Sequence, residues 1–319
     1  MILSPYTLSQ KTLIGNHNLE DEFSISTESN SWYFLPSYSN YAPSGLPDFD
    51  QRQDQTWRTS FSWSFCGPTA LANILWWFDS RHEDAKGYPG DGKDNYPLVS
   101  NYNAPGSPLP GPMADDHNFN NVNDLETSWI QFSKSGELIE KLATYSDIYW
   151  HKIPFLTISG TDRFQLSWGA RQWIKDAGLE DQYQVENIFR PSFSLISDRL
   201  QKDQGIILRL GYYIPSLPRF FPLTFAHYVS VAGINPDGYI AISDPEWDIA
   251  NYCDDPMFHN DPQYVSHDTY QVNLTSPFPM VSSWWLPSFE RNRRVIVIAA
   301  IIISEIDQVI SLEEFPEDQ

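Results

Sequence analysis

Cysteine and positive charge are both scarce in this 319-residue chain. The only two cysteines, Cys66 and Cys253, cannot form the disulfide framework of a small secreted scaffold and lack the spacing of a zinc site. A single bridge between them is an open alternative. The 20 Lys and Arg residues stand against 41 Asp and Glu, so the formal net charge at pH 7 is −21. Such a field repels nucleic acid and anionic lipid, and neither is expected as a partner.

Long apolar runs are missing too. The longest, Val295 to Ile303, is about half of the roughly 18 residues that a membrane-spanning helix needs, so no membrane insertion is expected. Its Val and Ile content is typical of a buried strand. The first 16 residues do not join a basic stretch to a hydrophobic core, so no signal peptide is visible. Because 41% of the residues are hydrophobic and 15% aromatic, the chain can bury a substantial core.

The apolar periodicity predicts an α+β fold in which a buried helix packs on an antiparallel sheet. We expect an N-terminal extension (1–46), one main domain (47–306) with an inserted loop at about 86–121, and an acidic C-terminal tail (307–319). Apolar residues three and four apart predict a helix that begins near Cys66. Further helices are expected at about 123–131, 135–146, 164–178 and 193–201, and strands at 33–35, 205–213, 228–234, 239–243 and 294–304.

Cys66 is the first candidate for chemistry because it stands at the predicted start of that helix, followed by Gly67 and Pro68. A thiol becomes a good nucleophile only as a thiolate. The unpaired N–H groups and the dipole of a helix N-terminus favour that anion, as does a neighbouring imidazolium. A buried, inert core cysteine is the alternative for this residue taken alone.

His227 and Asp244 are the candidate partners of Cys66. His227 opens one strand of a predicted hairpin, the turn at 235–238 reverses the chain, and Asp244 directly follows the second strand. The turn therefore brings the two side chains together, so that the carboxylate can fix the imidazole tautomer and stabilise the imidazolium. Taken alone, His227 could be a structural histidine and Asp244 a turn cap.

An oxyanion that forms beside Cys66 needs two hydrogen-bond donors, typically the N–H of the nucleophile and a side-chain amide. Three glutamines precede Cys66 closely enough to supply that amide: Gln51, Gln53 and Gln55. We prefer Gln53, and the other two stay open.

Three segments resemble the papain-like cysteine peptidases, and in particular their bacteriocin-leader-peptidase-like branch: Cys66-Gly67-Pro68-Thr69-Ala70, His227 to Gly233, and Ile242-Ser243-Asp244-Pro245. The resemblance implies a papain-like fold and a Cys-His-Asp triad of Cys66, His227 and Asp244. It also implies an extracellular or cell-surface location, with a cytoplasmic one as the alternative. The family often places its glutamine six residues before the cysteine, where this chain has Ser60.

The acidic loops offer a weaker hypothesis. Asp91 to Asn95, Asp115-Asp116 and Asp254-Asp255 could supply oxygen ligands for Ca²⁺, but none has the full spacing of an EF-hand, so solvated loops are favoured. A second cluster, His259 to Asp261 with His267 and Asp268, could bind a metal. No cofactor is expected.

The leading hypothesis is thus a cysteine peptidase that hydrolyses peptide or isopeptide bonds through an acyl-enzyme, with a peptide or protein as substrate. A transglutaminase-like acyl transferase would use the same residue types. A non-catalytic surface or binding protein on a papain-like scaffold is the third alternative, because a fold does not fix a function.

Overall fold

The fold is known from a computed structural model, which describes residues 32–38, 42, 45–49, 51, 64–82, 95–99, 133–148, 152–153, 156–157, 160–213, 226–246, 267–275, 284–289 and 294–306. All of these residues belong to one compact unit that begins at Trp32. The predicted helix at 123–131, most of the predicted loop at 86–121 and the acidic tail at 307–319 lie outside the described residues.

An antiparallel eight-stranded sheet forms the centre of this unit. Its main path runs β4-β10-β5-β6-β7-β8, with β1 paired to β6 and β9 paired to β10. The strands are β1 Tyr33–Phe34, β4 Tyr183–Phe189, β5 Gly205–Tyr213, β6 Ala226–Asn235, β7 Tyr239–Ser243, β8 Asp268–Gln271, β9 Trp285–Leu286 and β10 Arg294–Glu305. A separate small hairpin pairs β2 (Lys152–Ile153) with β3 (Leu156–Thr157).

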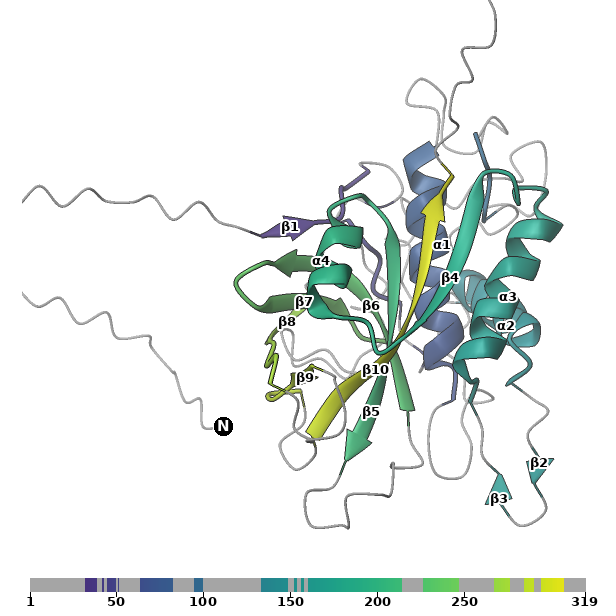
Figure 1. The fold of residues 1–319 in the computed structure, drawn as a ribbon. Helices are drawn as coiled ribbons and strands as arrows, with labels where there is room; N and C mark the ends of the chain where they lie inside the picture. The colour runs from purple at the N-terminus through teal and green to yellow at the C-terminus, as the bar shows by residue number, and fades with distance from the viewer. Residues whose placement is uncertain are drawn as a thin grey trace, which may run out of the picture. The chain divides into compact units, whose positions relative to one another are not determined.

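The part of the chain that the structure describes contains four helices: α1 Cys66–His82, α2 Ser133–Tyr145, α3 Arg163–Asp176 and α4 Phe193–Leu200. α1 contacts β5 and β6, α2 packs on α1, and α3 covers β4. α4 also contacts β5 and β6, and Figure 1 shows it on the other side of these strands from α1. None of the described helices is long and apolar enough to cross a bilayer.

The central strands are apolar because both of their faces are covered. β6 is buried over nine of its ten positions, and β10, which carries the apolar run Val295 to Ile303, lies between β4 and β5. Gly205 allows α1 to approach β5 closely: a Cβ at this position would lie 2.3 Å from Cγ2 of Ile74. A larger side chain at position 205 would push α1 away from β5.

The α+β class, with a buried helix on an antiparallel sheet, is confirmed. The helix at Cys66, the strand at 205–213 and the hairpin that follows it are present as expected. The predicted short strand at 33–35 is β1, which pairs with β6. The pattern did not predict β4 or β8, which both lie at ends of the main strand path.

Candidate active site

Cys66 is the first residue of α1 and is 9% exposed. It is a free cysteine, so the alternative of a Cys66–Cys253 disulfide is wrong. Cys253 itself lies outside the described residues. The first N–H groups of a helix have no intrahelical acceptor, and Pro68, two positions after Cys66, has no N–H to satisfy. The sulfur therefore lies where a helix end favours negative charge.

Gly67 lets the start of α1 pack against its surroundings. A Cβ on Gly67 would lie 2.7 Å from Cγ2 of Thr161, 3.3 Å from Cδ2 of Leu166 and 3.4 Å from Cδ2 of Tyr228. The first of these separations is closer than carbon atoms tolerate. Glycine thus lets the end of α1 that carries Cys66 pack against the start of α3 and against β6.

His227, the second residue of β6, is 5% exposed. Its Nε2 lies 2.6 Å from Oδ1 of Asp244, and the side chain of Cys66 lies near enough to the ring to raise its pKa. Since Nε2 faces the carboxylate, Nδ1 is the nitrogen left for the sulfur. The strand fixes the backbone of His227, and its two partners fix the ring.

The charge balance around His227 favours the imidazolium. Burial alone would lower the pKa of His227, because it removes water from the charged ring. The charge of Asp244, the neighbouring Tyr212, the hydrogen bond with Asp244 and the polar side chain of Cys66 outweigh burial, so the pKa of His227 is raised well above 6.5. A protonated imidazole beside a thiol is the state in which a thiolate–imidazolium pair forms.

Asp244 follows β7 and is 1% exposed. Its Oδ1 accepts from Nε2 of His227 and from the backbone N–H of Glu246 at 2.9 Å. The contact with Glu246 is a local turn of the kind that aspartate makes with the backbone two residues ahead. The turn-capping interpretation of Asp244 therefore holds together with its contact to His227, because one oxygen makes both bonds.

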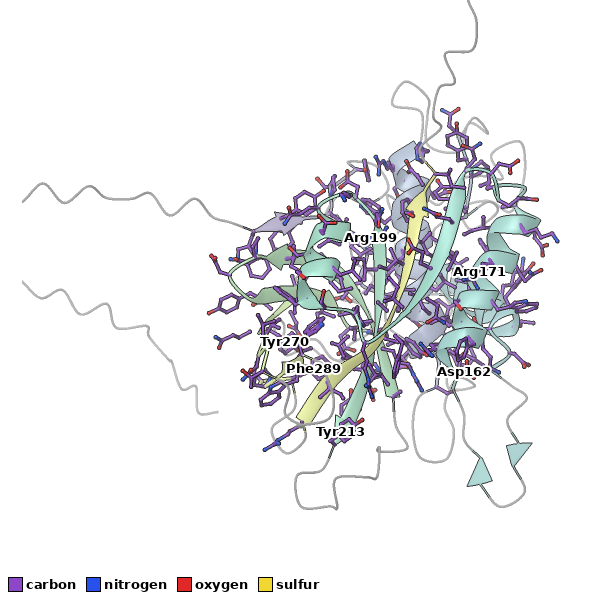
Figure 2. All side chains as sticks on the ribbon, viewed as in Figure 1. Asp162, Arg171, Arg199, Tyr213, Tyr270 and Phe289 are labelled. Atoms are coloured by element: carbon purple, nitrogen blue, oxygen red, sulfur yellow. The ribbon has the colours of Figure 1, made fainter. Side chains whose placement is uncertain are left out.

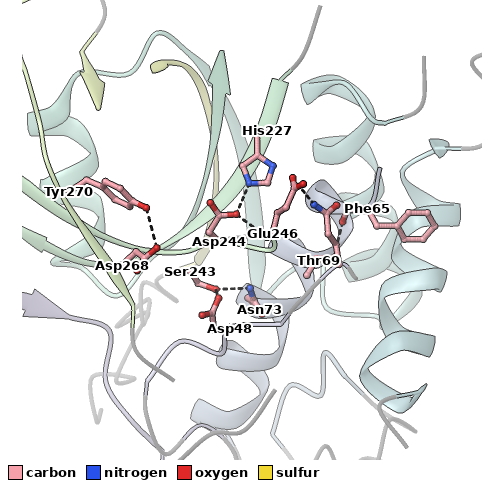
Figure 3. Close-up of polar contacts among 11 residues, drawn as sticks. Asp48, Phe65, Thr69, Asn73, His227, Ser243, Asp244, Glu246, Asp268 and Tyr270 are labelled. Carbon is pink, nitrogen blue, oxygen red and sulfur yellow. Dashed lines mark hydrogen bonds and ion pairs between the residues drawn. The ribbon is translucent and has the colours of Figure 1, made fainter. Parts of the chain in front are cut away.

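A buried polar network holds the chain just before Asp244. The hydroxyl of Ser243 donates to Oδ1 of Asp48 at 2.5 Å and accepts from Nδ2 of Asn73 at 3.0 Å. Oδ1 of Asn73 in turn accepts from the N–H of Phe49 at 3.0 Å. Figure 3 shows the Asp244 carboxylate between this network and the His227 ring. The network thus joins α1, the end of β7 and the segment at 48–49.

Gln51 is the only candidate amide donor among the described residues, because Gln53 and Gln55 lie outside them. It is 1% exposed, its N–H donates to the carbonyl of Pro245 at 2.8 Å, and its Nε2 donates to Oε2 of Glu246 at 3.3 Å. Its Oε1 is buried with no partner in the structure. Gln51 therefore lies against the turn that carries Asp244.

No metal cluster occurs in the part of the chain that the structure describes, where no three His, Cys, Asp or Glu residues are grouped to hold an ion. The acidic loops considered for Ca²⁺ lie outside that part, apart from Asn95. His267 donates from Nε2 to the carbonyl of Leu46 at 2.8 Å, and Asp268 accepts from the Tyr270 hydroxyl at 3.1 Å.

The sequence did not indicate the supporting residues Asp48, Asn73 and Ser243. One signal was available: Asn73 is a polar residue in the middle of an otherwise apolar stretch of α1, and a buried amide needs partners. Its partners lie 24 and 170 positions away in the chain, which no local pattern reveals.

Comparisons with known proteins do not assign this chain to a family. No family model and no curated protein matches the chain. Among solved structures, the chain is similar to the active wild-type interpain A cysteine protease of Prevotella intermedia, with 13% identity over 85% of this chain and 98% of that chain, and a TM-score of 0.38. A TM-score this low does not assign a function, so any functional proposal has to be argued from the residues of the site.

Proposed function

We propose that this protein is a cysteine peptidase that hydrolyses peptide or isopeptide bonds through a thioester acyl-enzyme. The observation that carries the proposal is the 2.6 Å contact between Nε2 of His227 and Oδ1 of Asp244, with buried Cys66 at a helix start near the same imidazole ring. The raised pKa of His227 supports the protonated imidazole that this chemistry needs.

In the proposed reaction, the Cys66 thiolate attacks the carbonyl carbon of the scissile bond. His227 gives its proton to the leaving amine as the C–N bond breaks, and a thioester on Cys66 remains. His227 then takes a proton from water, whose oxygen attacks the thioester, and the carboxylic acid product leaves as the sulfur is freed. Asp244 keeps the imidazole in the orientation that both steps require.

The oxyanion of each tetrahedral intermediate would accept from the N–H of Cys66 and from a glutamine amide. Gln53 is the donor that we favour from the sequence, and Gln51 is the described candidate. Separate Gln51→Ala and Gln53→Ala variants distinguish them: loss of the donor should lower kcat by about 100-fold or more with the Cys66 labelling rate retained.

The proposal is tested by combining alkylation with turnover. Iodoacetamide should label Cys66, and Cys66→Ala should lower hydrolysis of a mixed protein digest, followed by mass spectrometry, by roughly 1,000-fold or more. Cys253→Ala is the matched control, because it removes the only other thiol and should leave hydrolysis unchanged.

Three outcomes would contradict the proposal. If hydrolysis survives in Cys66→Ala, then Cys66 is not the nucleophile. Labelling of Cys253 with Cys66 untouched would indicate an inert, structural Cys66 and a non-catalytic protein. Incorporation of an added amine in place of hydrolysis would assign acyl transfer, which uses the same three residues.

A further inference from the structure

Two arginines and two aromatic rings form an exposed stack at the start of α3 and the end of β4. The guanidinium carbon of Arg163 lies 4.3 Å from the ring centroid of Phe164 and 4.8 Å from that of Phe189. Arg190 lies 4.8 Å from the same Phe189 ring. The rings are 62% and 55% exposed. We call these four residues the Arg–aromatic ladder.

The ladder places two positive charges on the surface of a strongly acidic chain. Acidic residues outnumber basic ones about two to one, and other described arginines use that excess: Arg199 pairs with Glu186 at 3.1 Å, and Arg81 with Glu305 at 3.6 Å. Within the described residues, Arg163 and Arg190 have no carboxylate partner. Among described partners, the side chain of Arg163 donates one hydrogen bond, a long one of 3.4 Å, to the neutral amide of Asn187.

The ladder also presents apolar surface that folding leaves uncovered. Phe164 and Trp168 are four residues apart on α3 and therefore share one face of the helix, and Trp168 is 53% exposed. Aromatic side chains and arginine are the residue types enriched where proteins bind one another. An exposed aromatic group with two guanidinium groups that have no carboxylate partner among the described residues thus matches a ligand that is partly apolar and carries carboxylate.

The ladder lies beside the proposed active site. Asp162 caps α3 immediately before Arg163, and Thr161, the residue before it, meets Gly67 at the start of α1. The hydroxyl of Tyr228, the neighbour of His227, donates to the carbonyl of Thr161 at 3.3 Å. Figure 2 marks Asp162 at this end of α3, with Arg171 further along the helix. The start of α3 therefore carries both the first residue of the ladder and, at Thr161, the contacts with Gly67 and Tyr228.

We propose that the Arg–aromatic ladder is a docking surface for a segment of the protein substrate in which one or two carboxylates are placed among aromatic or aliphatic side chains. Guanidinium groups bind carboxylates with defined geometry, and the ring faces pack on the apolar side chains. A long polyacidic segment is excluded as the ligand, because the net charge of −21 repels it before it arrives. That the bound protein is cleaved rests on the proposed function, but the binding itself does not.

Binding is measured in the Cys66→Ala background, so that no peptide is consumed. The probes are short fluorescein-labelled peptides of Phe, Leu and Pro that contain two Glu residues, and matched peptides in which Gln replaces Glu. Arg163→Gln with Arg190→Asn removes both charges. Asn is chosen because residue 190 has a φ of 52°, a left-handed conformation that Asn tolerates. A second double variant, Phe164→Ala with Phe189→Thr, removes the rings and keeps the charges.

We expect the Glu peptides to bind about tenfold more tightly than the Gln peptides, and each double variant to weaken Glu-peptide binding by about tenfold. The matched control is Lys202→Gln, which removes one exposed positive charge from the far end of α4 and should change binding little. Far-UV circular dichroism and melting curves establish that the variants fold.

Three results would each overturn the proposed surface. They are equal affinity for Glu and Gln peptides, double variants that fold and bind Glu peptides as tightly as the protein with an intact ladder, and no binding of any Glu peptide at millimolar concentration. Failure of the proposed function is seen separately, because Cys66 would then be inert to alkylation and to hydrolysis whether or not the ladder binds peptide.

Discussion

The His227–Asp244 pair combines near-complete burial with a short charge-assisted hydrogen bond. Such a pair contributes little to the free energy of unfolding compared with a well-packed apolar pair. Removal of one partner, however, leaves the other as a buried charge without a counter-charge. The protein retains the pair although desolvation opposes the charged imidazole. That arrangement is what a site for general acid–base chemistry needs, and it makes the pair measurable through its dependence on pH.

The first prediction concerns that pH dependence. Because the folded-state pKa of His227 is raised above 6.5, its contribution to stability is fully present below pH 6.5 and is lost as the pH rises through the raised value. In Asp244→Asn the charge is gone and burial dominates, which lowers the pKa of His227. We therefore expect the stability difference between wild type and Asp244→Asn to be largest at acidic pH and to shrink at alkaline pH.

Urea unfolding of both proteins across this pH range tests the prediction. The titrating groups that are common to both proteins cancel in the difference. A difference that stays constant, or grows with pH, would mean that His227 is not held as an imidazolium by Asp244.

Gly67 gives a second prediction at the residue scale. Gly67→Ala places a methyl group 2.7 Å from Cγ2 of Thr161, and we expect a loss of about 1–3 kcal/mol of unfolding free energy together with slower alkylation of Cys66. Thr161→Ser removes Cγ2 and keeps the hydroxyl that donates to the carbonyl of Ser146. The double variant should regain most of the loss. If it recovers nothing, the close contact is not the cause.

At the scale of elements, the site depends on how α1, β7 and the segment at 48–49 meet. The hydroxyl of Ser243 is the shared group, since it binds both the Asn73 amide of α1 and the Asp48 carboxylate. Each of these groups is buried, so loss of the hydroxyl leaves polar atoms short of a partner. The backbone next to Asp244 is thereby connected to α1, the helix that begins at Cys66.

The third prediction follows from this contact. Ser243→Ala should lower the unfolding free energy by about 1–3 kcal/mol, as measured by denaturant titration. Ser194→Ala is the matched control, because the Ser194 hydroxyl is exposed and bonds only to Ser192, so it should change stability by about 0.5 kcal/mol or less. Equal effects of the two substitutions would contradict the role given to Ser243.

Elements with strong local signals could be predicted from the sequence. The hairpin of β6 and β7 follows from two apolar runs around a turn in which Gly238 has a φ of 100°, and β10 follows from its continuous Val and Ile run. β4 was not predicted because its residues alternate between polar and apolar in only part of its length. β8 was not predicted because it has only four residues. Both gain their conformation from the neighbouring strand.

The site was predictable to the extent that its parts are local. His227 and Asp244 lie at the ends of one hairpin, so the turn alone brings them together. The contact of that hairpin with Cys66 depends on packing between segments about 160 residues apart, and the sequence offered only the residue types. The role of Gln51 at the Asp244 turn had no local signal either, because it depends on a contact with residues 245 and 246.

At the scale of the whole molecule, the dominant property is the excess of negative charge. A formal net charge of −21 makes the folded chain repel itself, and the compact state holds these charges closer together than the unfolded chain does. Salt screens this repulsion, with a Debye length of about 30 Å at 0.01 M and about 3 Å at 1 M. The surface ion pairs, such as Lys202–Asp198, contribute too little to reverse the balance.

The fourth prediction is therefore that sodium chloride stabilises this protein. Raising the salt from about 0.01 M to about 1 M at pH 7 should increase Tm by a few degrees, because screening removes repulsion mainly from the folded state. The increase should become small near pH 4.5, the isoelectric point of the sequence, where the net charge is close to zero. Melting curves at both salt concentrations and both pH values provide the test, and neutral sucrose serves as a control for salt-independent exclusion effects. A Tm that falls with salt at pH 7 would mean that attractive ion pairs, and not net repulsion, govern the electrostatics of the fold.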